Sequence, residues 1–169
     1  IQRTIWKNRA EKGIILFDEF AKQLKFDNVL ESVEFYYQAI RKQNGAIGII
    51  LQSINQLPNN STSASILENT QVIYSLNNEK GYDELVKRLN LSSHDLNQLK
   101  SIRNNLSGSR KYTEMFIKIG KESNIFRLEV PKEVYAAYLT DGQENQAIMA
   151  IYEKTNDMEL AIKEFTSKT

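Results

Sequence analysis

The residues best suited to chemistry are two adjacent carboxylates, Asp18 and Glu19, which follow the apolar run IILF at 14–17. An apolar strand delivers such residues to its carboxyl end, where open α/β sheets bind ligands. Adjacent carboxylates can divide two tasks, because one can hold a divalent metal ion while the other orients and polarises a water molecule. The structural alternative is that Asp18 caps a short helix at 19–25 and Glu19 complements the dipole of that helix.

The line IILFDEF has the form of a Walker B motif. In a P-loop NTPase the aspartate of this motif holds the magnesium ion of the bound nucleotide, and a following glutamate positions the water that attacks the terminal phosphate. The pattern therefore predicts that Asp18 binds Mg²⁺ and contributes to cofactor binding, and that Glu19 is catalytic.

A third polar residue, Gln52, follows a second apolar run, AIGIIL at 46–51. If the two apolar strands are neighbours, Gln52 emerges beside Asp18 and Glu19. An uncharged amide at that point can hydrogen-bond both a phosphate oxygen and the attacking water, and so report which nucleotide is bound. The alternative is a polar residue that begins a loop.

Several basic residues are candidates for contacts with phosphates. Arg41 lies near the end of a predicted helix, where its planar guanidinium could reach the phosphates bound by a neighbouring subunit; the alternative is a cation that complements the helix dipole. Arg110 and Lys111 precede a predicted hairpin and Arg127 lies within it, and these three could contact phosphates, form an interface or remain solvated.

The elements around these residues form a βαβ pattern. The strand at 14–17 has the continuous apolar character of a strand covered on both faces. Asn28 and Glu31 have the spacing of a capping box and open a helix that extends to about residue 43, and the strand at 46–51 follows after a short turn. Strands joined in this way are parallel in nearly all cases, so a parallel sheet is expected here.

The rest of the chain alternates between helical and strand periods. The predicted elements are a loop at 57–65 with a short helix at 63–69, a third strand at 71–76, helices around 82–89 and 96–102 with Ser92 or Ser93 as the cap of the second, an antiparallel hairpin of 112–119 and 125–130 with GKESN as its turn, and three helices that begin near Pro131, Asp141 and Asn156. The sequence thus predicts an α/β fold with a mostly parallel sheet, an antiparallel hairpin and C-terminal helices.

Composition excludes several classes of protein. The 169 residues suit one domain, and 41% hydrophobic with 25% charged residues is typical of soluble globular chains. The net charge of +1 argues against binding driven by a strongly basic or acidic domain. Without cysteine, and with His94 as the one histidine, disulfide scaffolds, thiolate zinc sites and histidine clusters are excluded. The apolar runs are shorter than the roughly 20 residues that span a bilayer.

One motif that the pattern requires is missing, because no GxxxxGK followed by Ser or Thr occurs in the sequence. The strand and helix that carry this phosphate-binding loop precede Walker B in such enzymes. We therefore expect the chain, which begins at Ile1, to be the C-terminal half of a nucleotide-binding domain. The expected division is a RecA-like sheet with helices at 1–130 and C-terminal helices at 131–169.

On these residues the chain resembles the TraG-type conjugation ATPases of Bacteroidetes conjugative transposons, relatives of type IV secretion ATPases within the HerA and FtsK group. The resemblance covers nearly the whole sequence. Its landmarks are GIILFDEF, RKQNGAIGIILQS, QVIYSLNN, the long SRKYTEMFIKIGKESNIFRLEVPKEVYAAYLTDGQEN and the NDMELAIKEF ending.

The resemblance implies an ATPase that uses ATP and Mg²⁺ and energises pilus assembly or substrate transfer at the cytoplasmic face of a conjugation channel, usually as a hexamer with other channel proteins as partners. It implies a glutamine motif at Gln52 and an arginine motif at Arg41, with Arg110 and Lys111 near a basic motif. The fragment alone, without the phosphate-binding loop, is expected to be inactive. Contact with DNA is left open.

Two other classes remain as alternatives. The first is a non-catalytic docking module of a secretion or conjugation complex, which would lack a phosphate-binding loop in its parent protein as well. The second is a DNA-processing domain such as a relaxase or nuclease, which requires a metal-binding cluster of carboxylates or histidines. One acidic pair and one histidine favour this second class least.

Overall fold

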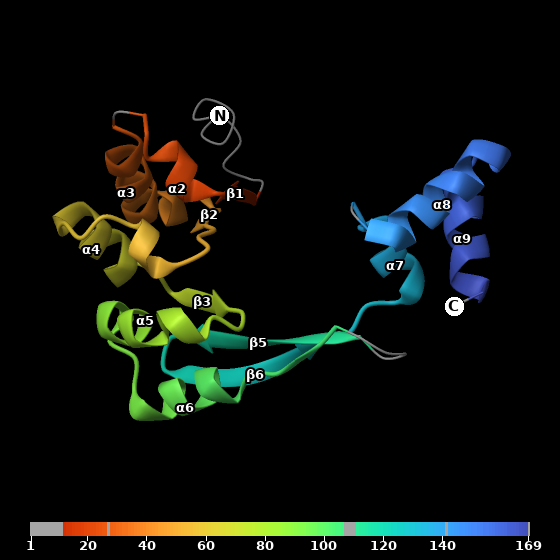
Figure 1. Ribbon diagram of the computed structural model, residues 1–169. Helices are drawn as coiled ribbons and strands as arrows, with labels where there is room; N and C mark the ends of the chain where they lie inside the picture. The colour runs from red at the N-terminus through yellow and green to blue at the C-terminus, as the bar shows by residue number, and fades with distance from the viewer. Residues whose placement is uncertain (1–11, 27, 107–110, 141, 169) are drawn as a thin grey trace. The chain divides into compact units, whose positions relative to one another are not determined.

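The computed structural model describes residues 12–26, 28–106, 111–140 and 142–168 (Figure 1). These residues form two compact units. The first contains the described residues up to Arg103 together with Glu114–Phe126, and the second contains the described residues of 104–113 and 127–169. Among the described residues, no helix has the length and apolarity needed to cross a membrane.

The first unit begins with a parallel strand pair. Strand β1 (Gly13–Phe17) pairs with β2 (Gly45–Ile49) from Gly13 opposite Gly45 to Phe17 opposite Ile49. The connection between them consists of α2 (Phe20–Gln23), α3 (Val29–Ala39) and the 3₁₀ helix η1 (Ile40–Gln43). The predicted βαβ unit with parallel strands is confirmed.

One face of this strand pair is packed and the other is open. Phe20, Val33, Leu57 and Ile66 form a buried cluster against which the inward side chains of the two strands pack. The opposite face of β1 carries Ile14 and Leu16, which are 72% and 65% exposed. The expectation that the first strand is covered on both faces therefore fails within the described chain, where only one layer of helices lies against the strands.

The start of α3 also differs from the expected capping box. Asn28 adopts a left-handed conformation with φ 62°, and its side chain makes no capping hydrogen bond. Its carbonyl oxygen instead accepts from the Ser32 hydroxyl at 2.7 Å. A left-handed residue turns the chain sharply, and this geometry directs the Asn28 side chain away from the first-turn N–H groups that a capping box requires.

The chain after β2 forms a short loop and a helix. The 3₁₀ helix η2 (Ile54–Gln56) leads to α4 (Ser61–Glu68), which begins earlier than the expected helix at 63–69. The earlier start follows from the Asn60 side chain, which accepts from the N–H of Ser63 at 2.9 Å and so caps the helix.

An antiparallel sheet forms the other part of the first unit. Strand β3 (Val72–Ser75) pairs with β5 (Tyr112–Ile119), and β5 pairs with β6 (Glu122–Leu128). The 3₁₀ helix η3 (Glu79–Gly81), α5 (Tyr82–Leu89) and α6 (Ser93–Ser101) follow β3. The two α-helices pack on this sheet through a core of Tyr82, Leu91, Leu99, Ile102 and Phe116 (Figure 1).

The predicted α/β class, with a parallel sheet, an antiparallel hairpin and helices, is confirmed, but the balance of the sheet differs from the expectation. In the described chain, parallel pairing is confined to β1 and β2, and the third strand joins the hairpin. The hairpin turn is shorter than the predicted GKESN, because left-handed Gly120 (φ 57°) reverses the chain within Gly120 and Lys121 and lets β6 start at Glu122.

The second unit is mainly helical. The short strand β4 (Asn104–Asn105) pairs with Tyr112 and Thr113, and α7 (Lys132–Ala137), α8 (Gly142–Thr155) and α9 (Met158–Lys168) follow. Ala136, Ile148 and Ala161 form its buried core. The three predicted C-terminal helices are confirmed.

The residues predicted at the starts of the last two helices are Asp141 and Asn156. Asp141 lies outside the described residues. Asn156 is left-handed with φ 51° and does not cap α9 as expected. The cap is Asp157, whose carboxylate accepts from the N–H of Leu160 at 3.0 Å.

Candidate functional site

Two backbone hydrogen bonds bring the predicted residues to one edge of the parallel strand pair. The N–H of Ile50, just after β2, donates to the carbonyl of Phe17 at 2.9 Å, and the N–H of Phe20 donates back to the carbonyl of Ile50 at 3.1 Å. The chain between Phe17 and Phe20 contains Asp18 and Glu19. Because the strands are parallel and in register, the residues that follow β1 and those that follow β2 leave the sheet at the same end.

Glu19 has an unusual backbone conformation at this edge. Its φ of 47° and ψ of 44° place it in the left-handed region, which costs a residue with a Cβ roughly 1–2 kcal/mol. The strained turn lets the chain pass directly from β1 into α2 and buries Phe20 completely. Strained backbone of this kind gathers at functional sites, where the surrounding structure compensates for it.

Asp18 and Glu19 are both exposed, and their contacts are local. The Oδ1 atom of Asp18 accepts from the N–H of Glu19 at 2.8 Å, and its carbonyl oxygen accepts from the Gln23 amide at 3.1 Å. The Glu19 carboxylate forms an ion pair with Lys22. Asp18 therefore does not cap a helix in the ordinary way, since its side chain bonds the next N–H along the chain.

Gln52 is fixed through its backbone and exposed through its side chain. Its N–H donates to Oε1 of Gln56 at 2.9 Å, within a capping box formed by Ser53 and Gln56. Its carbonyl oxygen accepts from the side-chain amide of Asn78 at 3.1 Å. No hydrogen bond between the Gln52 side-chain amide and another described residue is present, so this amide can serve a ligand at the edge where Asp18 lies.

The structure separates Arg41 from this edge. Arg41 is exposed on η1, immediately before β2 begins. The N–H of Gly13 donates to the carbonyl of Asn44 at 3.3 Å, so η1 lies where both strands start. At about 3.3 Å per residue, the length of β2 puts roughly 16 Å between Arg41 and the carboxylate edge.

A close backbone contact holds η1 in this place. A Cβ on Gly45 would lie 2.6 Å from Cγ1 of Ile40, which is buried. Only glycine allows this approach, and the arginine-bearing helix is thereby tied to the first residue of β2.

Lys111 belongs to the second unit and has partners there. Its Nζ donates to the hydroxyl of Tyr135 and to Oε1 of Glu144, both at 3.2 Å, and lies 4.3 Å from the centre of the Tyr135 ring. The hydrogen bond with Tyr135, reinforced by Glu144, raises the pKa of Lys111 above its usual value. Arg110 lies outside the described residues. Arg127 stacks over the ring of Tyr112 at 3.9 Å.

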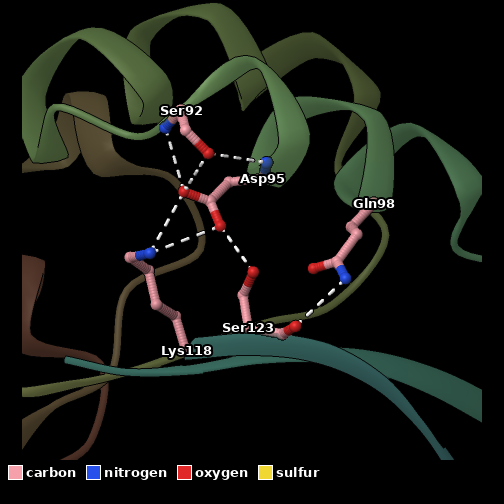
Figure 2. Close-up of polar contacts among 5 residues, drawn as sticks. All are labelled: Ser92, Asp95, Gln98, Lys118 and Ser123. Carbon is pink, nitrogen blue, oxygen red and sulfur yellow. Dashed lines mark hydrogen bonds and ion pairs between the residues drawn. The ribbon is translucent and has the colours of Figure 1, made fainter. Parts of the chain in front are cut away.

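A second carboxylate centre was not singled out by the sequence. Asp95, near the start of α6, is 2% exposed and accepts hydrogen bonds from the Ser123 hydroxyl at 2.5 Å and from Nζ of Lys118 at 3.1 Å (Figure 2). It also accepts from the N–H of Ser92 at 2.9 Å, in a capping box that confirms Ser92 as the cap. Burial alone raises the pKa of Asp95, but the hydrogen bonds from Ser123, Ser92 and Lys118 outweigh it and hold the pKa well below the usual range.

The donor set at the β1–β2 edge suits Mg²⁺ bound together with a phosphate ligand. Among the described residues no group of three or more His, Cys, Asp or Glu side chains could hold a metal ion by itself. Magnesium commonly takes one or two protein carboxylates and fills its remaining positions with phosphate oxygens and water. An exposed aspartate with a neighbouring glutamate and a free amide fits that mode of binding.

Comparison with known protein families shows to which family this chain belongs. The model of the TraG P-loop domain matches residues 2–169. The chain belongs to the TraG P-loop family. The predicted membership of the TraG-type conjugation ATPases is confirmed, and the chain is a P-loop domain of that family.

A solved structure supports the fold of this TraG P-loop chain. The structure of VirB4 of Thermoanaerobacter pseudethanolicus matches with a TM-score of 0.56 and 18% sequence identity, covering 76% of this chain. The match covers 34% of the VirB4 chain, so this chain spans about a third of that protein. No curated protein sequence matches.

Proposed function

We propose that this chain supplies part of the ATP-hydrolysing site, at one end of the β1–β2 strand pair, of an ATPase that energises pilus assembly or substrate transfer in a conjugation or type IV secretion system. The observation that carries the proposal is the shared edge of β1 and β2, where Asp18, Glu19 and Gln52 follow two parallel strands in register. The family supports ATP as the nucleotide and Mg²⁺ as its metal ion.

Each residue at the edge has a separate task in the proposed reaction. Bound Mg²⁺ supplies positive charge that stabilises the phosphate oxygens during transfer. Asp18 holds that ion through its carboxylate, directly or through water. Glu19 accepts a hydrogen bond from the attacking water and orients it, and Gln52 donates its amide N–H to a γ-phosphate oxygen.

The chain's own sequence contains no GxxxxGK motif, so the proposed site needs a phosphate-binding loop that this sequence does not contain. The open face of β1 supports this, since Ile14 and Leu16 are apolar residues of a strand that lacks a second covering layer among the described residues. On this proposal the chain by itself does not hydrolyse ATP. A coding sequence without such a loop upstream of Ile1 would favour the docking module instead.

Arg41 is proposed to act on a neighbouring subunit. Its position at the starting edge of the strands puts it too far from Asp18 of the same chain for direct contact with a shared phosphate. A hexameric ring would bring the starting edge of one subunit toward the nucleotide of the next. In Arg41→Ala, turnover should then be lost only in the assembled oligomer, and mixing with a Glu19 variant should restore part of it.

The central experiment is Glu19→Gln in the full-length protein. The amide keeps the size of the side chain but lacks the negative charge that orients and polarises the attacking water, so turnover should fall by roughly 10²- to 10⁴-fold while MgATP binding persists. Glu31→Gln, which changes an exposed glutamate of α3, is the matched control and should leave turnover unchanged. Full turnover in Glu19→Gln would reject the assignment.

A further inference from the structure

The loop that follows Gln52 is held by residues at both ends of α5. Before the helix, Asn78 donates its side-chain amide to the carbonyl of Gln52 at 3.1 Å. Near the end of the helix, Arg88 donates three hydrogen bonds into the same loop. The segment of chain that carries Gln52 is therefore bonded at two separated points, by a residue that precedes α5 and by one near the end of α5.

The Arg88 contacts are made to main-chain carbonyl oxygens. One terminal nitrogen donates to the carbonyls of Ile54 at 2.9 Å and Leu57 at 2.8 Å, and the other donates to the carbonyl of Pro58 at 3.0 Å. A permanently charged planar fork can reach three carbonyl groups in one arrangement, which an ammonium group at a single point cannot reproduce. The side chain of Leu57 is buried in the core beneath β1 and β2, so this loop is fixed from both sides.

The Asn78 contact depends in turn on the core of the antiparallel sheet. The hydroxyl of Tyr82 accepts from the N–H of Asn78 at 3.2 Å and donates to Oδ1 of Asn77 at 3.1 Å. The Tyr82 residue is 3% exposed and packs with Phe116 of β5. A Cβ on Gly81 would lie 3.0 Å from Nδ2 of Asn78, so glycine leaves room for the amide that bonds Gln52.

We propose that Arg88 and Asn78 are positioning residues that lock the Gln52 loop to α5 and thereby couple the γ-phosphate contact of Gln52 to the antiparallel sheet. The proposal rests on the function proposed above, because it assigns a purpose to the position of Gln52. Both backbone groups of Gln52 are bonded while its side chain stays available, which is the arrangement that a sensor of phosphate needs. A displacement of about 1 Å at such a contact can cost on the order of 10²-fold in rate.

Steady-state kinetics and binding on the full-length protein test the coupling. Arg88→Lys keeps the charge and removes the fork, and Asn78→Ala provides a second, independent variant. Each should lower kcat roughly 10- to 100-fold and leave the Kd for MgATP nearly unchanged. Lys87→Ala, which removes an exposed cation from the same helix, is the matched control and should leave both values unchanged.

A double-mutant cycle separates positioning from general damage. In a Gln52→Ala background, adding Arg88→Lys should lower kcat by less than about twofold, because the residue to be positioned is gone. If Arg88→Lys lowers kcat equally with and without the Gln52 side chain, the coupling is overturned.

Hydrogen exchange of the loop tests whether Arg88 and Asn78 hold it, separately from whether Gln52 takes part in turnover. In Arg88→Lys the amides of residues 53–57 should exchange about tenfold faster or more, while those of residues 143–155 in α8 stay unchanged. Faster loop exchange together with full turnover in Gln52→Ala would keep the clamp and reject the proposed role of Gln52. Unchanged loop exchange in both the Arg88 and Asn78 variants would overturn the clamp whatever the turnover.

Discussion

Asp18 and Asp95 both lie near the beginning of a helix in the first unit, and the structure uses them in opposite ways. Asp95 is buried, and serine hydroxyls, an N–H group and a lysine satisfy its carboxylate (Figure 2). Asp18 is exposed, and its carboxylate accepts from the N–H of the very next residue. A carboxylate whose acceptor sites are filled by the protein contributes to stability, whereas one that faces solvent at the carboxyl end of β1 has sites left for a metal ion.

The two aspartate centres also differ in the backbone conformation of the residue that precedes the helix. Ser92, the cap of α6, has the extended conformation that helix caps ordinarily adopt, with φ −76° and ψ 165°. Glu19 at the start of α2 is left-handed, and its side chain makes no capping bond. The Asp95 centre therefore follows the rules of stable local structure, while the Asp18 centre departs from them where the proposed chemistry takes place.

The largest expected effect belongs to the buried centre. In Asp95→Ala of the full-length protein, Lys118 is left half-buried without its carboxylate, and the opening free energy of α6 should fall by about 3 kcal/mol. Native-state hydrogen exchange of the α6 amides measures this value. Asp83→Ala, at an exposed aspartate of α5, should change stability by less than about 1 kcal/mol. Equal effects of the two substitutions would contradict the contrast.

Substitution of the exposed Asp18 should change the magnesium requirement of ATP turnover instead of stability. Asp18→Asn removes the charge of the proposed magnesium ligand, so the Mg²⁺ concentration for half-maximal ATP turnover should rise about 10- to 100-fold. Thermal stability should remain within about 0.5 kcal/mol of the wild type, because the exposed side chain has few partners to lose. A magnesium titration of the full-length protein gives the answer, and an unchanged requirement would remove Asp18 from the metal site.

The pH dependence of stability should reveal the depressed pKa of Asp95. A carboxyl group with a lowered pKa in the folded state stabilises the fold fully above its unfolded pKa of about 3.9, and this contribution is lost as pH falls through the folded pKa. The stability difference between wild type and Asp95→Asn should thus shrink by up to about 1.4 kcal/mol per pH unit below pH 4. Parallel acid curves for the two proteins would show that Asp95 does not titrate as described.

A smaller effect is expected from the strained backbone of Glu19. Glu19→Gly and Glu19→Ala both remove the proposed catalytic carboxylate, but only glycine adopts φ 47° without penalty. The glycine variant should therefore be more stable than the alanine variant by about 1 kcal/mol, with turnover lost in both. Thermal unfolding of the two variants side by side measures the difference, and a less stable glycine variant would argue against the left-handed turn.

Much of the β1–β2 edge was predictable because its signals are local. Continuous apolar runs marked both strands, polar residues marked their ends, and the βαβ rule made the strands parallel. The opposite position of Arg41 also follows from this rule, since a crossover helix runs against the strands and ends where the next strand starts.

The parts that sequence reasoning missed depend on contacts between distant segments. The left-handed turn at Glu19 is stabilised by the bond from Phe20 to Ile50, which a local pattern cannot contain. The spacing of Ser92 and Asp95 is a capping signal, but the burial of Asp95 comes from Lys118 and Ser123 on the hairpin. The expected cap at Asn28 failed because backbone geometry there overrides a matching pair of residue types.

The structure of the full-length protein with MgADP and beryllium fluoride, which mimics the γ-phosphate, tests the proposed nucleotide site most directly. If Asp18, Glu19 and Gln52 form the nucleotide site, the mimic lies at the shared edge of β1 and β2, with Asp18 bonded to the magnesium ion or to its water and the Gln52 amide within hydrogen-bonding distance of a fluoride. A nucleotide bound away from this edge, with neither residue in contact, would contradict the assignment of the site.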